Sequence, residues 1–252
     1  MKYEEIVEHN LLEYSKLLID KMGNHPSVSN NTLVEHITPI HGRVAINKNS
    51  DNTHVLFIIK ELLGNDCKSV LEIGTLWGGA LIAMMQSKHT SMFVSIDPFD
   101  GYYKKDEGKR PGFGSLDPKV GKTNSYDLVH ENVVNNNQHS HKFELLQGLS
   151  TDKTVIDKVS KIFADGVDLL FIDGDHSLDG VLNDWNNYHT LINPGGIVVF
   201  DDHWIDDLSQ YEWEDDFMNV VKAYEQLSSA PEFFNNWKEI GLYGDKKIIQ
   251  RV

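Results

Sequence analysis

Short apolar runs alternate with helical patterns over most of the chain after Lys68. Five such runs stand out, namely residues 69–73, 92–96, 143–147, 167–172 and 197–200. Continuous apolar runs of this length, separated by helices, are typical of buried parallel strands. Two further segments, 240–243 and 247–252, flank a Gly-Asp-Lys turn and predict an antiparallel hairpin. We therefore expect an α/β fold with one doubly wound, mostly parallel sheet that an antiparallel C-terminal hairpin completes.

The first 50 residues follow a different pattern. Apolar side chains recur at helical spacing over residues 4–22, which predicts an amphipathic helix. Residues 23–50 are rich in Asn, Ser, His, Gly and Pro, and this composition indicates a long loop or arm. A second helix is expected to start within residues 51–53 and to end before Gly64. The chain is therefore divided into an N-terminal helix and arm, residues 1–50, and one domain, residues 51–252.

The charge balance narrows the classes of function. The chain has 23 Lys and Arg against 38 Asp and Glu, a formal net charge of −15. This balance excludes a broad nucleic-acid-binding role, because such surfaces need basic side chains to contact phosphates. Cys67 is the only cysteine, so no intrachain disulfide can form, and no apolar run is long enough to cross a bilayer. We expect a cytoplasmic protein without a membrane partner, and the sequence leaves open whether it forms a homo-oligomer.

A glycine-rich turn follows the first predicted strand. Residues 72–78 read E-I-G-T-L-W-G and lead into a helix that is expected to start at Ala80. Glycines at a strand-to-helix turn let a ligand approach the backbone, and the helix N-terminus attracts an anion. The dinucleotide fingerprint G-x-G-x-x-G needs a second glycine where Leu76 stands, which disfavours NAD. A glycine turn that only packs a helix against a strand is the structural alternative.

Two carboxylates at strand ends accompany this turn. Glu72 lies two residues before Gly74, and Asp97 ends the next predicted strand, so both suit a ligand's ammonium group and ribose hydroxyls. The E-x-G-x-x-x-G pattern, followed by the acidic strand end S-I-D at 95–97, resembles motifs I and II of class I S-adenosylmethionine-dependent methyltransferases. This resemblance covers about residues 51–252 and implies a Rossmann-like methyltransferase fold with S-adenosylmethionine as cofactor. The expected cofactor-binding residues are Glu72, Gly74, Thr75, Leu76, Gly78, Asp97, Ser150 and Asp173.

Acidic clusters end two later strands. Residues 167–176 read V-D-L-L-F-I-D-G-D-H, and residues 195–203 read G-G-I-V-V-F-D-D-H. In an open parallel sheet the ligand site lies beyond the carboxyl ends of the strands, so we expect both clusters and the glycine turn at one edge. Several carboxylates in one small site repel each other unless a cation neutralises them. Hard oxygen ligands without cysteine suit Mg²⁺ or a related divalent ion.

The two clusters resemble those of metal-dependent O-methyltransferases. The catechol and caffeoyl-CoA branches have an Asp after the fourth strand and an Asp-Asn pair after the fifth. The resemblance therefore assigns the metal ligands to Asp173, Asp201 and Asp202. The D-G-D-H form and the Asp-Asp pair are more similar to the macrocin-type sugar O-methyltransferases. His176 falls where the plant branch has its catalytic Lys, and the resemblance implies that His176 is the base and acts with Asp173.

Other interpretations of the same residues stay open. Asp173 or Asp201 could cap a following helix or hold only the cofactor, and His176 could be a polar residue at a helix start. Asp175 and His203 are expected to contact the metal-binding side chains rather than the metal itself. Residues 99–122 form a long connection near the ligand edge, which is typical of a lid or specificity loop.

The sequence therefore predicts a divalent-metal-assisted O-methyltransferase that uses S-adenosylmethionine. By resemblance, its small-molecule acceptor is a sugar or glycoside, which would place the protein in carbohydrate biosynthesis. A catechol-like aromatic acceptor is the near alternative. Two alternatives come from other classes, a nucleotide-cofactor oxidoreductase or hydroxylase on a similar fold and a methyltransferase-like module without catalysis.

Overall fold

A computed structural model describes residues 53–89, 91–100, 123–203, 214–243 and 245–252. The predicted helix at 4–22 and arm at 23–50 lie outside the described residues, as does most of the connection at 99–122. The division of the chain at residue 50 and the lid therefore stay predictions. The second predicted helix is present as α3 (Thr53–Leu63), and Gly64 follows its last residue with a φ of +57°.

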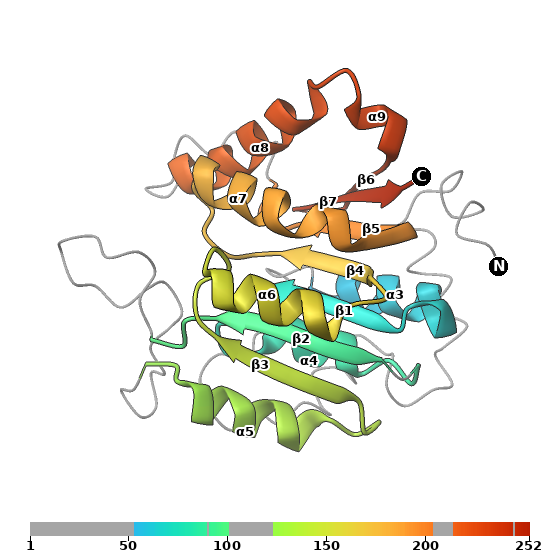
Figure 1. Cartoon of the computed structure of the whole chain (residues 1–252). Coiled ribbons are helices and arrows are strands. Elements are labelled where there is room, and N and C mark those ends of the chain that lie inside the picture. The colour runs from blue at the N-terminus through green and yellow to red at the C-terminus, as the bar shows by residue number, and fades with distance from the viewer. Residues whose placement is uncertain (1–52, 90, 101–122, 204–213, 244) are drawn as a thin grey trace. The chain divides into compact units, whose positions relative to one another are not determined.

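The strands form one seven-stranded sheet with the order β3-β2-β1-β4-β5-β7-β6 (Figure 1). They are β1 (Ser69–Ile73), β2 (Met92–Asp97), β3 (Lys142–Gln147), β4 (Val167–Ile172), β5 (Ile192–Phe200), β6 (Trp237–Tyr243) and β7 (Lys246–Arg251). β1 pairs in parallel with β2 and β4, and β4 pairs in parallel with β5. β7 pairs antiparallel with both β5 and β6. The predicted α/β class, with its mostly parallel sheet and antiparallel C-terminal hairpin, is confirmed.

Helices connect the strands, and the chain packs as two compact units. The other helices are α4 (Gly79–Met85), α5 (Tyr126–Asn136), α6 (Lys153–Ile162), α7 (Leu178–Tyr188), α8 (Glu214–Ser228) and α9 (Phe233–Asn236). Short 3₁₀ helices occur at Gly64–Asp66 and His189–Leu191. One unit contains α3, α4 and α5, and the other contains the sheet with α6, α7, α8 and α9. Among the helices of the described ranges, none combines the length and apolar character that a membrane span requires.

In the first unit, α4 packs against both α3 and α5. Gly78, the residue before α4, has a φ of +84°, a conformation that glycine adopts without strain. A side chain at Gly78 would lie 3.3 Å from Val133 and 3.6 Å from Val129, both on α5. In the structure, the missing side chain of Gly78 allows the start of α4 to approach α5 closely. The expected role of Gly78 in cofactor binding stays a prediction.

β5 starts five residues earlier than the apolar run at 197–200 predicts. Residues 192–196 read I-N-P-G-G. Because Asn, Pro and Gly favour turns, the sequence pattern did not predict a strand there. Val167 of β4 nevertheless pairs with Ile192, and the register shifts before Leu169 pairs with Ile197. Gly195 has a φ of +81° within this irregular stretch. The predicted strand start was wrong because pairing with β4 overrides the local turn preference.

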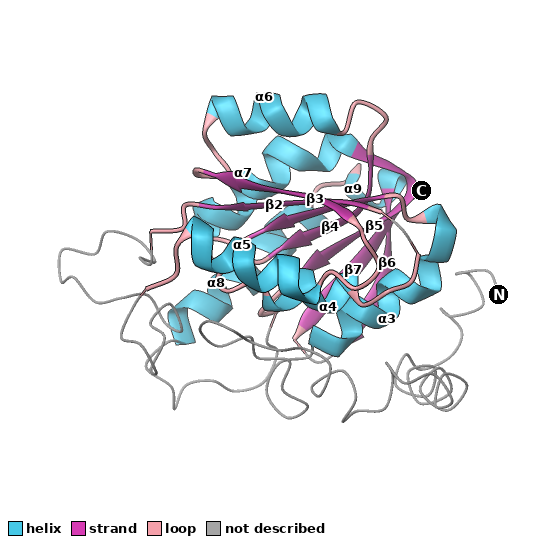
Figure 2. Cartoon of the chain, turned by 90° about the horizontal axis from the view of Figure 1, so that it is seen from below, coloured by secondary structure: helices cyan, strands magenta, loops and turns pink. Residues whose placement is uncertain are grey.

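The core of the second unit lies between the sheet and helices α6, α7 and α8. Helices α6 and α7 cover the face of the sheet that is toward the viewer in Figure 1, and Figure 2 shows α6 on that same side of the strands. Alternate strand residues supply this face, among them Leu71, Ile73, Val94, Ile96, Leu170, Ile172, Val198 and Phe200. Because side chains alternate along a strand, this spacing explains why one face gathers a continuous apolar layer.

Trp185 anchors α7 in this core. Its side chain is 5% exposed, and its ring lies 5.8 Å from Phe200, 5.8 Å from Phe233 and 4.8 Å from Trp237, measured between ring centroids. Phe200 is the last residue of β5, so these contacts attach α7 to the carboxyl end of that strand. Aromatic pairs at such distances stabilise beyond the area that they bury.

We predict that Trp185→Ala lowers the free energy of unfolding by about 3 to 5 kcal/mol, because it removes a buried indole from this cluster and leaves a cavity. Phe234→Ala is the matched control, since Phe234 is 55% exposed and borders the same cluster. It should cost less than about 1 kcal/mol. Urea denaturation of both variants measures the difference, and equal losses would show that Trp185 does not anchor the helix.

Candidate active site

The loops that follow β1, β2, β4 and β5 meet at the carboxyl edge of the sheet. Backbone hydrogen bonds continue the strand ladders into these loops, because the amide of Gly74 donates to Ile96 at 2.9 Å and that of Asp173 donates to Ile73 at 2.9 Å. The amide of Asp201 likewise donates to Ile172 at 3.0 Å. The positions of the glycine turn and of both acidic clusters are therefore fixed by the sheet, as the sequence predicted from parallel pairing.

Gly74 brings the first and fourth strand ends into direct contact. Its φ is +90°, and a Cβ atom at this position would lie 1.8 Å from the carbonyl oxygen of Asp173. Leu76 follows with a φ of +49°, an unusual conformation for a residue with a side chain. Leu76 occupies the position of the second glycine in the dinucleotide fingerprint. Its backbone is left-handed although the residue is not a glycine.

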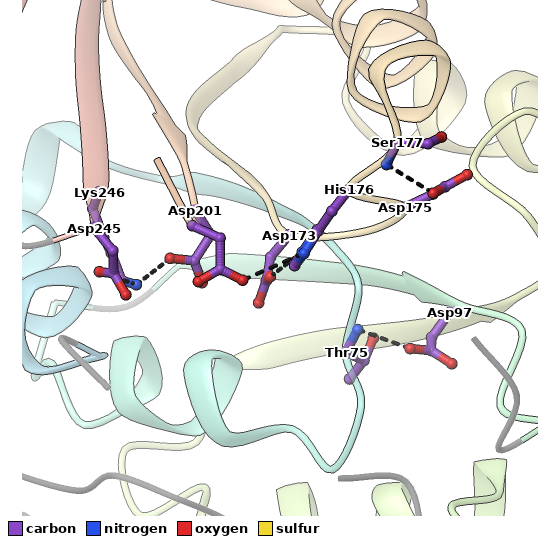
Figure 3. A network of polar contacts seen from close by, with 10 residues as sticks. Thr75, Asp97, Asp173, Asp175, His176, Ser177, Asp201, Asp245 and Lys246 are labelled. Carbon is purple, nitrogen blue, oxygen red and sulfur yellow. Dashed lines mark hydrogen bonds and ion pairs between the residues drawn. The ribbon is translucent and has the colours of Figure 1, made fainter. Parts of the chain in front are cut away.

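Asp97 and Glu72 occupy different environments. Asp97 Oδ2 accepts a hydrogen bond of 2.9 Å from the amide of Thr75, which joins the end of β2 to the glycine turn (Figure 3). Glu72 is fully buried, and its Oε2 accepts a hydrogen bond from the hydroxyl of Ser95. The Ser95 hydroxyl also lies 2.5 Å from the Thr75 hydroxyl. Glu72 thus supports the turn through Ser95 and Thr75, and its contact with a ligand's ammonium group stays a prediction.

Ser150 lies in the loop after β3, near the end of β2. The amide of Gly148 donates to the carbonyl of Asp97 at 3.1 Å, and Gln147 Nε2 donates to the carbonyl of Pro98 at 3.2 Å. These bonds hold the loop after β3 beside the loop after β2. Ser150 itself donates from its hydroxyl to Asp184 Oδ1 at 2.5 Å, a contact that the sequence did not predict.

His176 lies between two of the predicted metal ligands. Its Nε2 is 3.2 Å from Asp173 Oδ1, and its Nδ1 is 3.3 Å from Asp202 Oδ2. The side chains of His176, Asp173 and Asp202 are 15, 26 and 22% exposed, so solvent reaches all three. Burial alone would lower the pKa of His176, but the hydrogen bond to Asp173 and the charges of both carboxylates raise it to about 9.

Asp201 is paired with a lysine that the sequence analysis missed. Lys246 Nζ forms an ion pair with Asp201 Oδ1 and lies 3.1 Å from Asp245 Oδ1 (Figure 3). The Lys246 side chain is only 3% exposed. Burial alone would lower the pKa of Lys246, but Asp201 and Asp245 raise it above its ordinary value, so the ammonium group stays charged.

The predicted hairpin could have indicated that Lys246 lies near Asp201. Residues 244–246 were predicted as a turn, whereas β7 already starts at Lys246. Phe200 at the end of β5 pairs with Lys247 near the start of β7. Because the two strands are antiparallel, the first residues of β7 must lie beside the last residues of β5. A predicted antiparallel partner for β5 therefore implies that Asp245 and Lys246 lie near Asp201.

Among the described residues, potential metal ligands form two groups that share Asp202. One group contains Asp173, His176 and Asp202, and the other contains Asp201, Asp202 and Asp245. Within each group, the candidate ligand atoms lie within 4.8 Å of one another. Asp202 thus connects Asp173 and Asp201, the other two predicted ligands. Lys246 is the counter-ion of the second group, and His176 is the basic member of the first.

The carboxylates outnumber the basic side chains at this edge. Four acidic side chains face two basic ones, Lys246 and His176. Burial and the charge of Asp201 raise the pKa of Asp202 to about 7, and burial together with Asp201 raises the pKa of Asp173 well above its ordinary value. Besides burial, repulsion between the carboxylates contributes to both shifts, and the acidic side chains exceed the basic ones in number. This excess, on oxygen ligands, fits a divalent ion such as Mg²⁺.

Asp175 contacts the start of α7, and the amide of His203 donates to the carbonyl of Asp245 at 2.7 Å. Ser177 caps α7, since its hydroxyl accepts a hydrogen bond from the first turn, and Asp175 Oδ1 accepts one of 3.0 Å from the Ser177 amide (Figure 3). The capping role considered for Asp173 therefore belongs to Ser177. The ring of His203 lies edge-on to Tyr224 with a centroid distance of 5.4 Å. The expected support of the metal ligands by Asp175 and His203 stays a prediction.

The strand order, the glycine turn and the acidic edge together define an α/β domain of the methyltransferase kind. A family model for a methyltransferase domain matches residues 71–203. This match covers more than half of the chain and includes the glycine turn and both acidic clusters. The chain therefore belongs to this methyltransferase family, and the methyltransferase class predicted from the sequence is confirmed.

The chain is also similar to a curated protein of a virus. The chain is 31% identical over 172 residues to uncharacterized protein R132 of Acanthamoeba polyphaga mimivirus, an overlap of 67% of this chain and 66% of the relative. The chain thus spans about two thirds of the length of that relative.

Solved structures share the fold at low sequence identity. The O-methyltransferase from Bacillus cereus, in complex with SAH, superposes with a TM-score of 0.56 and 16% identity over 94% of this chain and 97% of that chain. The calicheamicin methyltransferase CalS11 superposes with a TM-score of 0.55 and 13% identity over 94% of this chain and 91% of that chain. At such identities the likeness concerns the fold, and the predicted Rossmann-like methyltransferase fold is confirmed.

We predict that Gly74→Ala strongly destabilises the carboxyl edge, because the new Cβ would collide with the Asp173 carbonyl and the φ of +90° would be strained. The free energy of unfolding should fall by more than about 3 kcal/mol. Gly195→Ala is the control, since its φ is also positive, at +81°, but no atom lies within 4 Å of the added Cβ. Thermal and urea denaturation compare the two, and equal losses would remove the argument for close loop contact.

Proposed function

We propose that this protein is an S-adenosylmethionine-dependent O-methyltransferase in which a divalent ion assists transfer to a small-molecule hydroxyl. One observation carries the proposal, the convergence of His176 with Asp173 and Asp202 on the sheet edge that also holds the glycine turn. A methyltransferase needs a cofactor site next to an acceptor site. The glycine turn would provide the first, and the acidic clusters at the same edge of the sheet would provide the second. The sulfonium of the cofactor is already activated, so alignment of acceptor and methyl group supplies much of the catalysis.

The cofactor would bind at the glycine turn and the end of β2. Gly74 keeps the turn free of a side chain, and Thr75 fixes Asp97 through its backbone amide. Asp97 at a strand end suits the ribose hydroxyls, because a carboxylate accepts two charge-assisted hydrogen bonds from neighbouring hydroxyls. Leu76 and Gly78 would shape the turn that leads into α4. Ser150, beside the loop after β2, would lie near the adenine.

Asp173, Asp201 and Asp202 would hold a divalent ion, and His176 would lie beside it. When bound, such an ion would lower the pKa of an acceptor hydroxyl and orient it. His176 would accept the hydroxyl proton, since its imidazole already lies within 3.3 Å of two carboxylates that orient the ring. Cation binding to these carboxylates would also lower the pKa of His176 from about 9 toward neutrality, which leaves the imidazole free to act as a base. Lys246 keeps one oxygen of Asp201 fixed throughout.

A sugar or glycosylated small molecule is the proposed acceptor. The Asp201–Asp202 pair and the D-G-D-H sequence at 173–176 support it by their resemblance to macrocin-type enzymes. The structural likeness to a calicheamicin methyltransferase is consistent with a natural-product acceptor. The net charge of −15 disfavours strongly anionic acceptors. A catechol-like aromatic is the competing acceptor, and a paired screen of glycosides and catechols with methyl-labelled cofactor distinguishes the two.

We predict that Asp97→Ala weakens binding of S-adenosylhomocysteine by roughly ten- to a hundred-fold, because a charge-assisted hydrogen bond contributes about 1.5 to 3 kcal/mol. Isothermal titration calorimetry measures the dissociation constant. Asp157→Ala is the control, since the Asp157 side chain is 59% exposed and pairs only with Lys153 among the described residues. Unchanged affinity in Asp97→Ala would remove Asp97 from the cofactor site.

We predict that the purified protein binds Mg²⁺ or Mn²⁺ and that Asp201→Ala loses this binding, because the carboxylates supply the ion's ligands. Excess chelator should abolish methyl transfer but leave the affinity for S-adenosylhomocysteine unchanged, since the ion serves the acceptor. His176→Ala should keep the metal affinity and lower turnover by roughly a hundred- to ten-thousand-fold, as expected for a lost general base. Calorimetry with the metal and a labelled methyl-transfer assay give separate readouts.

The controls separate the metal from the base. His130→Ala, an exposed histidine of α5, should match the parent protein in both assays. Full activity in chelator, with no metal in the purified protein, would contradict the metal-assisted mechanism. Parent-like turnover in His176→Ala would instead reject His176 as the base and leave the metal site intact.

A further inference from the structure

Helix α7 forms hydrogen bonds with two different atoms of Ser150. The Ser150 hydroxyl donates to Asp184 Oδ1 at 2.5 Å, and the Tyr188 hydroxyl donates to the Ser150 carbonyl at 2.6 Å. Asp184 and Tyr188 are four residues apart in α7, so they lie on one face of the helix. Asp184 is 2% exposed and Tyr188 is fully buried, whereas Ser150 is partly exposed.

The same carboxylate also lies against the loop after β4. A Cβ atom on Gly174 would come within 3.0 Å of Asp184 Oδ2, so this oxygen packs directly on the Gly174 backbone. Gly174 is the residue that follows Asp173. Asp184 therefore contacts two loops of the carboxyl edge, one that carries Ser150 and one that carries the acidic cluster.

A buried carboxylate at this position is costly for the fold. Val181 and Trp185, its neighbours on the same helix face, belong to the apolar core, and a leucine would suit that surface better. Burial raises the pKa of Asp184 to about 7, even though the hydrogen bond from Ser150 favours the charged form. The contacts with Ser150 and with the Gly174 backbone are the polar interactions that accompany this burial.

We propose that Asp184 and Tyr188 are positioning residues that fix the loop at Ser150 to receive the nucleoside half of the cofactor. This inference rests on the proposed function. The loop after β3 is bonded to the loop after β2 through Gly148 and Asp97. A ribose held by Asp97 therefore directs its base toward the loop of Ser150, because base and ribose are joined by one glycosidic bond. A rigid loop reduces the conformational entropy that binding must otherwise remove.

The test compares Ser150→Ala, Asp184→Ala and the double variant by calorimetry with S-adenosylhomocysteine and, separately, with adenosine. Each single variant should weaken both ligands about tenfold, since one hydrogen bond is lost. The double variant should bind no more weakly than Asp184→Ala, because the two side chains act through one contact. We call the contacts of Asp184 and Tyr188 with Ser150 the clamp. If the clamp positions the loop for the nucleoside half, adenosine and S-adenosylhomocysteine should lose affinity by the same factor. Mg²⁺ affinity should not change.

A second Ser–Asp pair provides matched controls at the other end of the sheet. The Ser69 hydroxyl donates to Asp168 Oδ2 at 2.9 Å, at the amino ends of β1 and β4. Ser69→Ala removes the same kind of contact, whereas Asp168→Ala also removes the bonds that Asp168 accepts from two backbone amides and from Asn193. Both variants should leave the affinity for both ligands unchanged. Tyr224→Phe, which loses a hydroxyl bond to Glu239 of 2.9 Å, is the control for Tyr188→Phe. Tyr188→Phe carries the test if Asp184→Ala does not fold, because it removes one contact to Ser150 and nearly preserves the side-chain volume.

The outcomes separate this inference from the proposed function. Failure of the parent protein to bind S-adenosylhomocysteine would overturn both. Tight binding by the parent, with unchanged affinity in the folded Ser150, Asp184 and Tyr188 variants, would overturn the clamp alone. Equal weakening in the Ser69 and Asp168 controls would also overturn it, because the effect would then reflect general stability. Additive losses in the double variant would reject the shared contact.

Discussion

Excess negative charge at the ends of β4 and β5 is the constraint on which the site depends. The parallel sheet forces the loops after these strands to one edge, and both loops carry carboxylates. Lys246 offsets part of this charge from the antiparallel strand, and His176 offsets a further part from the loop before α7. Burial, together with repulsion from the neighbouring carboxylates, raises the pKa of Asp173 and Asp202. These properties are the basis on which we propose a divalent ion at this edge.

Unusual backbone conformations accompany this edge. Leu76, Phe99 and Asp202 each have a φ near +50°, and each follows the carboxyl end of a parallel strand. Residues with side chains adopt this conformation at a cost of about 1 to 2 kcal/mol. The direct contact of Gly74 with the Asp173 carbonyl gives the physical reason for such turns, since the loops approach so closely that the chain must bend sharply at the strand ends.

The sequence predicted the parallel sheet and its acidic edge because both follow from local patterns. Apolar runs mark strands, and parallel pairing places the ends of those strands together, so Asp173, Asp202 and His176 could be expected near one another. Other contacts arise only from tertiary pairing. Lys246 depends on the antiparallel register with β5, and the early start of β5 depends on Ile192 pairing with β4. Asp184 could have been suspected as a polar residue on the apolar face of a helix, but its partner Ser150 lies 34 residues away.

Helix α7 joins the stability of the core to the geometry of the site. Its first turn is capped by Ser177, directly after His176, so the helix start fixes the loop that presents the imidazole. Its buried face then carries Asp184, Trp185 and Tyr188 in close succession. Trp185 holds the helix to the end of β5, while the two polar residues hold the loop at Ser150. A shift of this helix would therefore move His176 and the loop at Ser150 together.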